Sequence, residues 1–284
     1  MVFNRFSAKL NAKMSIQKAV PRPVWVTALF LLLTMLLPNL ILGIVGDRLQ
    51  EALYYLQSGY DPAEVFQYVF VQSSGQSAMF FILNLLIQLF TSVMNVGYCF
   101  YTMHIARNEQ AAYRDIFYGF SILGKSIWIN ILIGLFTFLW TLLFMIPACV
   151  TIILGIVMDS YIMLALYPIL MIAGIAGGIY MSLRYSLSIY FMIDEGCTSR
   201  HAINLSKQAM HGRVGEFFIL QLTFIGWMLL SAITMGILSV WVKPYMEATN
   251  VNFYDTVRRP SNPGQDTYTG QVYNFGPGNQ SPGL

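Results

Sequence analysis

The sequence contains few charged residues, and this scarcity excludes the ordinary water-soluble globular class. Asp, Glu, Lys and Arg make up 10% of the 284 residues, against about 25% in a typical soluble domain. Hydrophobic residues reach 56% of the chain. The net charge of +3 is too small to suggest a nucleic-acid partner, so none is expected.

Cysteine is also scarce, and recognisable catalytic motifs are missing. The three cysteines, Cys99, Cys149 and Cys197, are odd in number and form no CxxC pair, which argues against a disulfide framework or a zinc site. The sequence has no HExxH, GxSxG or Walker A motif. We therefore expect no metal, no cofactor and no enzyme activity, although an active site built from scattered residues stays open as the weakest alternative.

The sequence is rich in long apolar segments that contain no charged residue. No acidic or basic residue lies between Lys125 and Asp159, and four further stretches have the same character: residues 24–46, 65–103, 160–183 and 217–242. Each run has at least the roughly 20 residues that a helix needs to cross a hydrocarbon core about 30 Å thick. The predicted fold class is therefore all-α, a polytopic transmembrane bundle of about six helices.

The distribution of basic residues predicts the orientation of these helices. Residues 1–23 carry Arg and Lys but no acidic residue, so this basic N-terminal segment is expected in the cytoplasm. Residues 47–77 hold several acidic residues against one arginine, which is typical of the outer side. We expect a transmembrane domain at residues 24–257. The tail at 258–284 is rich in Pro, Gly, Asn and Gln and is predicted to be disordered.

The last apolar run, residues 217–242, allows two topologies. Gly236 either begins a hairpin or lies inside a single tilted span. In the hairpin version residues 216–234 leave the cytoplasm and residues 237–257 return, which gives six spans and a cytoplasmic C-terminus. Its final helix then carries three charged residues: Lys243, Glu247 and Asp255. The five-span version leaves two C-terminal arginines outside, against the charge rule, so we favour six spans.

Two cytoplasmic connections carry the pattern of amphipathic helices at a membrane surface. In the first, apolar side chains recur at helical spacing: Tyr113, Ile116, Phe117, Phe120 and Leu123. In the second, Thr198 is placed to cap a helix with one apolar and one basic face. The candidates for contact with membrane lipids or with an unidentified membrane-protein partner are Arg200, Lys207 and Arg213. The alternative is that both helices only anchor their loops at the interface.

Asp159 is the one charged residue between Lys125 and Arg184. An acidic residue inside a membrane is a functional candidate by default, because its charge is costly there. The alternative, which we favour, is that Asp159 lies in an exposed outer turn.

The regions 98–146 and 185–233 align with an offset of 87 residues, which pairs Tyr98 with Tyr185 and Trp140 with Trp227. Parallel repeats of this kind occur in transporters, whose binding sites lie at the repeat interface. Chance similarity between apolar helices explains the alignment at least as well, so the sequence leaves the question open.

The segment from Tyr185 to Asp255 resembles a known family. It contains four short motifs: Phe-Ile-Gly-Trp at 224–227, Thr-x-Gly at 234–236, Trp-Val-x-Pro-Tyr at 241–245 and Phe-Tyr at 253–254. They are similar to motifs of the bacterial integral membrane family catalogued as domain of unknown function 975. The resemblance implies a six-helix protein of the bacterial cytoplasmic membrane with no assigned biochemical role. It also implies structural roles, namely close packing or a kink, for the motif residues Gly226, Trp227, Gly236, Pro244 and Tyr245.

Two functions are compatible with these observations. The first is a structural or accessory membrane component that contacts lipid or a partner through its cytoplasmic helices. The alternative is a small-solute transporter or permease, which polar amides within the spans would suit. Ion-coupled carriers usually need an acid or base inside the membrane, and the apolar runs offer none apart from Asp159. We therefore favour the first function.

Overall fold

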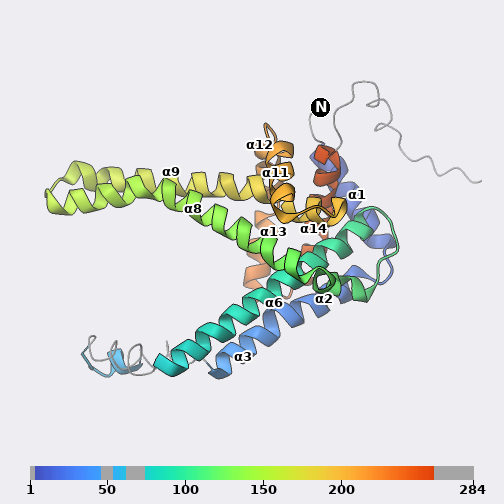
Figure 1. Ribbon diagram of the computed structural model, residues 1–284, viewed down its shortest axis with the longest axis horizontal. Helices are drawn as coiled ribbons and strands as arrows, with labels where there is room; N and C mark the ends of the chain where they lie inside the picture. The colour runs from blue at the N-terminus through green and yellow to red at the C-terminus, as the bar shows by residue number, and fades with distance from the viewer. Residues whose placement is uncertain (1–3, 46–53, 62–73, 259–284) are drawn as a thin grey trace, which may run out of the picture.

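The computed structural model describes residues 4–45, 54–61 and 74–258, and the regular structure in these ranges is helical (Figure 1). Five segments are long and apolar enough to cross a membrane: Pro23–Ile41, Phe81–Ala106, Leu123–Val157, Tyr161–Glu195 and Val214–Ile233. The all-α, multi-span fold class is therefore confirmed. Most of the acidic connection at 47–77, and the predicted disordered tail from 259 onward, lie outside the described residues.

The N-terminal segment, expected only to be basic, contains helix α1 (Arg5–Lys18). Asn4 caps this helix, because its side-chain oxygen accepts hydrogen bonds from two backbone N–H groups of the first turn. One face of α1 carries small buried side chains: Ala8, Ala12 and Ser15. This face packs on α14 (Ser239–Arg258), where the Asn252 side-chain amide donates to the backbone oxygen of Ala8 at 2.9 Å.

The first span is a continuous helix with a wider turn in its middle. It consists of α2 (Pro23–Leu31), a π-helical turn (Leu32–Leu36) and α3 (Leu37–Val45). Pro38 has no N–H to donate to the carbonyl four residues earlier, and the backbone N–H just before it bonds to a carbonyl five residues back. The proline thus accounts for a π-turn at this place without ending the helix.

Helix α6 (Ser74–Ala106) packs against α2 through a buried aromatic centre. The hydroxyl groups of Tyr98 and Thr27 share a hydrogen bond at 2.8 Å. The Tyr98 ring also lies 4.5 Å from the ring of Phe30, measured between centroids. These contacts hold α2 and α6 together and form the first of two arms, which we call the α6 arm.

The connection after α6 is more compact than the amphipathic helix predicted for it. It forms a short 3-10 helix, η3 (Tyr113–Phe117), and one turn of α-helix, α7 (Tyr118–Ser121). Gly97 of α6 lets the two backbones touch, because a Cβ added there would lie 1.9 Å from the backbone oxygen of Ile116. Ile116 is buried in this contact, whereas the rest of the predicted apolar stripe is exposed: Tyr113, Phe117, Phe120 and Leu123.

Helices α8 (Leu123–Val157) and α9 (Tyr161–Tyr185) form a long hairpin, the α8–α9 arm, which extends away from the other helices (Figure 1). Glycines on α9 allow the two helices to approach closely. A Cβ added to Gly177 would lie 2.5 Å from a ring carbon of Phe144, and one added to Gly174 would lie 2.9 Å from the sulfur of Met145. The hairpin is thus stabilised by side chains of α8 that pack directly against the backbone of α9 at its glycines.

Beyond α9 the chain breaks into shorter helices. It turns at Ser186 and Leu187, continues as α10 (Ser188–Glu195), and then forms α11 (Ser199–Ala209). Gly196 ends α10 with a left-handed φ of 61°. The fourth span therefore comprises α9 and α10 rather than one uninterrupted helix.

The last apolar run forms a hairpin with a polar return helix, which is the arrangement of helices in the six-span version. Its first leg consists of α12 (Val214–Leu222) and α13 (Ile225–Ile233), and Gly236 turns the chain with a φ of 86°. The second leg is α14. Contacts between the legs follow in antiparallel order: Phe217 with Phe253, Gln221 with Asn250, and Phe224 with Tyr245. The 20 residues of α14 extend over about 30 Å, and in the described part of the chain it packs as a sixth segment beside the five apolar spans.

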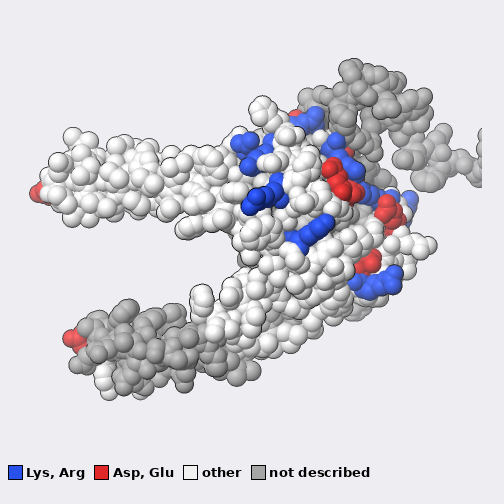
Figure 2. All heavy atoms as spheres, in the orientation of Figure 1, with Lys and Arg blue, Asp and Glu red and all other residues white. Residues whose placement is uncertain are grey.

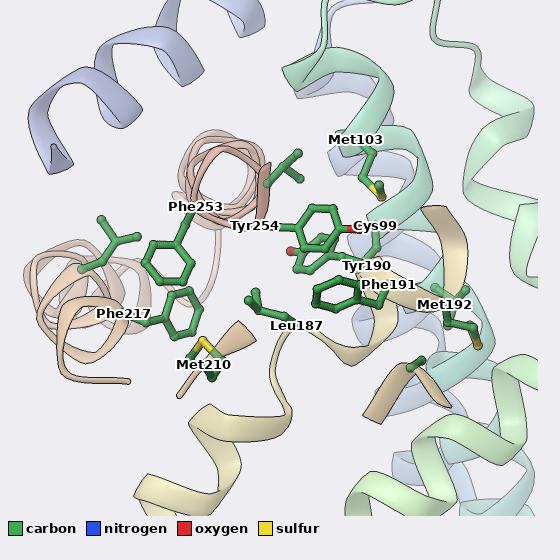
Figure 3. Packing of buried hydrophobic residues seen from close by; sticks show 14 of the residues in the cluster. Cys99, Met103, Leu187, Tyr190, Phe191, Met192, Met210, Phe217, Phe253 and Tyr254 are labelled. Carbon is green, nitrogen blue, oxygen red and sulfur yellow. The ribbon is translucent and has the colours of Figure 1, made fainter. Parts of the chain in front are cut away.

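The helices share a core at the end of the molecule from which the two arms diverge. Figure 3 shows this core, in which the aromatic side chains of α10, α12 and α14 meet Cys99 and Met103 of α6. The same end of the molecule holds most of the charged residues, whereas the arms are almost free of them (Figure 2). We call it the charged end.

Candidate functional site

An arginine at the end of α6 joins three helices at the charged end. The guanidinium of Arg107 donates two hydrogen bonds to the carboxylate of Asp194, both at 2.8 Å, and so ties α6 to α10. It also donates to Asp255 of α14, at 2.7 Å from Nη2 and 3.4 Å from Nε. A planar guanidinium suits such paired contacts, which are among the stronger hydrogen bonds in proteins.

Two further groups complete this ionic cluster, and both belong to α14. The Tyr254 hydroxyl donates to Asp194 at 2.9 Å, and the Arg258 guanidinium pairs with the same carboxylate. Hydrogen bonds to Asp194 raise the pKa of Arg107 above its usual range, and those to Asp255 add to the effect against the opposing cost of burial. The Arg107 side chain therefore carries a permanent charge that fixes three helix ends.

A second set of polar contacts lies deeper in the bundle and also involves α14. The Tyr190 hydroxyl of α10 donates to the carboxylate of Glu247 at 2.6 Å. One turn further along α14, the Asn250 side-chain oxygen accepts from the side-chain amide of Gln221 at 2.8 Å. These bonds satisfy polar groups among apolar neighbours and fix the register between α14, α10 and α12.

Lys243 approaches aromatic rings at the start of α14. Its Nζ lies 4.8 Å from the centre of the Phe30 ring and 5.2 Å from that of Tyr98. Both rings belong to the contact between α2 and α6, so the lysine links α14 to the α6 arm through cation–π interactions. Lys243 and Glu247 are thus both held by groups from other helices.

The three basic residues predicted to face lipid or a partner have different surroundings. Arg200 on α11 is exposed. Lys207 instead lies over two rings, 5.3 Å from Phe136 and 5.5 Å from Tyr185. Arg213 is half-buried at the start of α12. Of the three, Arg200 is the one whose side chain faces away from the protein.

The family-motif residues also separate into two groups. Gly236 supplies the positive φ of the α13–α14 turn, Pro244 is buried in α14, and the Tyr245 ring packs edge-on against Phe224 at 5.6 Å. By contrast, a Cβ added to Gly226 meets no heavy atom within 4 Å, and Trp227 is 49% exposed. The close packing expected at Gly226 is therefore not made by the described part of the chain.

Asp159 lies at the tip of the α8–α9 arm. It is exposed in the turn between the two helices and adopts a φ of 51°. In the α8–α9 arm it is the one charged residue between Lys125 and Arg184. The structure thus puts Asp159 far from the polar groups of α14.

Reasoning from the sequence predicted neither the ionic cluster nor the hydrogen bond between Glu247 and Tyr190. No motif or spacing in the sequence pairs Arg107 with Asp194. Arg107 and Asp194 are 87 residues apart, which is also the offset that aligns Tyr98 with Tyr185, but equivalence in an alignment does not predict contact. Within the ranges that the structure describes, no group of three or more His, Cys, Asp or Glu residues is arranged to hold a metal ion.

The fold and the arrangement of charges define a multi-pass helical membrane protein whose helix ends are tied by ion pairs on one side. The family described as "Protein of unknown function (DUF975)" matches residues 61–261, and the chain belongs to this family. The resemblance found in the sequence is thereby confirmed. No curated protein and no solved structure matches the chain.

Proposed function

We propose that this protein is a non-enzymatic, structural or accessory component of the bacterial cytoplasmic membrane, and that its charged end binds the headgroups of anionic lipids. The observation that carries the proposal is the gathering of Lys and Arg side chains where the arms meet (Figure 2). Among the described residues, Lys243 is the one basic residue inside the bundle. The others lie in α1, in connections or at helix ends.

The same distribution supports a cytoplasmic position for the charged end. Lys and Arg are retained on the cytoplasmic side of bacterial membrane proteins, and short connections show this bias most strongly. The tip of the α8–α9 arm carries an acid, Asp159, and no basic residue lies within α8 beyond Lys125. In this orientation α1 and the end of α14 both lie in the cytoplasm.

Exposed apolar and basic side chains occur together on η3 and α7. Tyr113, Phe117 and Phe120 are exposed at 48%, 43% and 38%, and Arg114 between them is also exposed. Aromatic side chains favour the headgroup region, where the ring is apolar and the surroundings are wet, and a nearby arginine attracts anionic lipid. This segment and Arg200 form the surface that we assign to lipid.

The test is lipid retention by the full-length protein. The double variant Arg114→Gln, Arg200→Gln removes two exposed charges, and we expect it to copurify with less phosphatidylglycerol from mixed-lipid nanodiscs, as measured by mass spectrometry. Lys207 is left intact because its contacts with Phe136 and Tyr185 stabilise the fold. Asp159→Asn, at the far tip, is the control and should retain lipid as the wild type does. Equal retention by the double variant would count against the proposal.

A small-solute transporter is the second candidate, and one observation favours it. An ion-coupled carrier needs an acidic residue inside the membrane. Asp159 does not meet this need, because it lies at the exposed tip of the α8–α9 arm, whereas Glu247 on α14 does. Proteoliposomes containing the wild type should then accumulate a solute in a proton-dependent manner, and Glu247→Gln should abolish the accumulation. Background flux across a panel of amino acids, sugars and organic anions would remove this candidate.

A further inference from the structure

Helix α1 carries an apolar stripe that the bundle leaves exposed. Phe6, Leu10 and Met14 follow one another at intervals of four residues, and they are 75%, 45% and 43% exposed. Residues at this spacing lie on one face of an α-helix. The buried face of small residues, which packs on α14, is nearly opposite. The protein therefore covers one side of α1 and presents an apolar side to its surroundings.

The side chains around this stripe are basic and not acidic. Lys13 is exposed next to the stripe on the helix surface, and Arg5 and Arg22 are exposed at the beginning of α1 and just after its end. The sequence has no Asp or Glu before Asp47. Apolar side chains accompanied by Lys and Arg are typical of helices that lie in the interface of an anionic membrane.

The contacts of α1 indicate that it lies at the level where the spans begin. Residues 19–22 alone separate it from the first span, and such a connection reaches at most about 18 Å. Trp25, in the first turn of α2, is 65% exposed, as is typical of tryptophan in the headgroup region. The Nζ of Lys9 lies 4.7 Å from the centre of the Phe224 ring, which belongs to the span Val214–Ile233. Helix α1 is therefore packed beside the spans.

We infer that α1 is an interfacial helix, which inserts Phe6, Leu10 and Met14 among the acyl chains of an anionic membrane surface and holds Lys13 at the lipid phosphates. The inference rests on the proposed function for the cytoplasmic position of the charged end. It adds a contact with acyl chains to the headgroup contacts of η3 and α7.

A protein partner suits the stripe less well than lipid does. Three partly exposed side chains cannot provide the roughly 800 Å² per partner that a stable protein interface buries. The lysine at the edge of the stripe combines a long apolar stem with a charged end, which matches the boundary between acyl chains and headgroups. The size and the chemistry of the stripe therefore both favour a lipid surface.

Spin labels on the full-length protein test the inference. Cys149 and Cys197 are replaced by Ser, and the buried Cys99 stays in place. In nanodiscs that contain phosphatidylglycerol, a label at Leu10→Cys should be reached readily by oxygen, which enters the acyl region, and poorly by a water-soluble nickel chelate. The matched control is Asn11→Cys, exposed on another side of the same helix. Its ratio of oxygen to chelate accessibility should be several-fold lower.

Phe6→Cys, one turn earlier on the stripe, gives a second reading and should behave as Leu10→Cys does. Two results would overturn the inference. If the chelate reached the labels on the stripe as readily as the label at residue 11, the stripe would face water. If neither reagent reached them, protein would cover the stripe.

The contribution of charge is tested with Lys13→Gln in the Leu10→Cys background. Replacing phosphatidylglycerol by phosphatidylcholine should make the label more accessible to the chelate, and Lys13→Gln should reduce this difference between the two lipids. A label that responds to neither change would contradict an anionic surface as the ligand.

Failure of this inference can be distinguished from failure of the proposed function. Lipid retention depends on Arg114 and Arg200, which are not on α1, whereas the label reports on residue 10. Reduced retention in the double variant together with a label that faces water would overturn the inference on α1 alone. Unchanged retention with a label among the acyl chains would support α1 as an interfacial helix and count against the headgroup site.

Discussion

The α8–α9 arm and the bundle around α14 are both helical, but they are stabilised by opposite means. In the most apolar part of α8, and likewise of α9, 11% of the residues are buried inside the protein, against 28% in the first span and in α6. The arm has no ion pair between its helices among the described residues, and its close contacts are made by glycines. The bundle around α14 contains the ionic cluster, Glu247 and Lys243.

This difference shows what each region requires from its surroundings. Lipid is as apolar as Leu or Ile, so burial of such side chains between two helices gains little in a membrane, and close packing at small residues takes over. Polar groups cannot be left without partners there, so those on α14 find them on neighbouring helices. The stability of the α8–α9 arm therefore depends on the close fit of its two helices, and that of the bundle around α14 depends on specific polar partners.

Removing Arg107 should have the largest effect, because it breaks the polar contacts that distinguish the bundle around α14 from the α8–α9 arm. Arg107→Gln leaves Asp194 and Asp255 without their guanidinium and should lower the free energy of unfolding by about 3 kcal/mol. Thermal unfolding is measured in detergent by the reaction of a thiol dye with the buried Cys99, after Cys149 and Cys197 are replaced by Ser.

Arg114→Gln is the control for this experiment, since Arg114 is exposed on η3. It should unfold at nearly the wild-type temperature. If both arginine variants behaved alike, the ionic cluster would contribute nothing specific to stability.

Gly97→Ala should have the next largest effect, because it tests the close contact between α6 and η3 rather than the α8–α9 arm. The new Cβ would lie 1.9 Å from the backbone oxygen of Ile116, so η3 must move away from α6. We expect a loss of about 2 kcal/mol in the same assay. Gly124→Ala meets no atom within 4 Å and should cause no loss. Equal stability of the two variants would contradict the close contact of the backbones.

Gly177→Ala tests shape in the arm, where a smaller effect is expected. Its Cβ would lie 2.5 Å from the Phe144 ring, which can rotate away, whereas a backbone oxygen cannot. The loss should be about 1 kcal/mol, and the added substitution Phe144→Leu should restore most of it. The control is Gly134→Ala on α8, which has open space around it. Failure of Phe144→Leu to restore stability would show that another contact limits the approach.

Asp159→Asn should have the smallest effect. The side chain is exposed at the tip of the arm, and asparagine accepts the positive φ of this turn as readily as aspartate does. Unfolding should change by less than about 0.5 kcal/mol. A larger loss would mean that the charge at the tip has a role in the fold.

Features that depend on local sequence could be predicted, and those that depend on distant partners could not. The spans were predicted from the length of the segments without charged residues, and the turn at Gly236 was predicted because glycine is common in turns. Helix α1 was missed because its buried face consists of Ala8, Ala12 and Ser15, which carry little hydrophobic signal. The break at Ser186 and Leu187 carries no proline or glycine, so nothing local marks it.

The candidate site shows the same limit more strongly. Glu247 was recognised as a charged residue of the final helix, but its partner Tyr190 lies 57 residues earlier on another helix. Arg107 meets Asp255 across 148 residues. Such pairings arise from the packing of whole helices, which periodicity within one segment does not encode.

The docking of α1 on α14 has a consequence for synthesis. The hydrogen bond from Asn252 to Ala8 joins residues 244 positions apart, so α1 emerges from the ribosome long before the helix that it contacts. Until then its face of small residues can contact only α6, where Ser15 donates to the backbone oxygen of Ala106. The docking of α1 on α14 is therefore completed only after translation has passed α14.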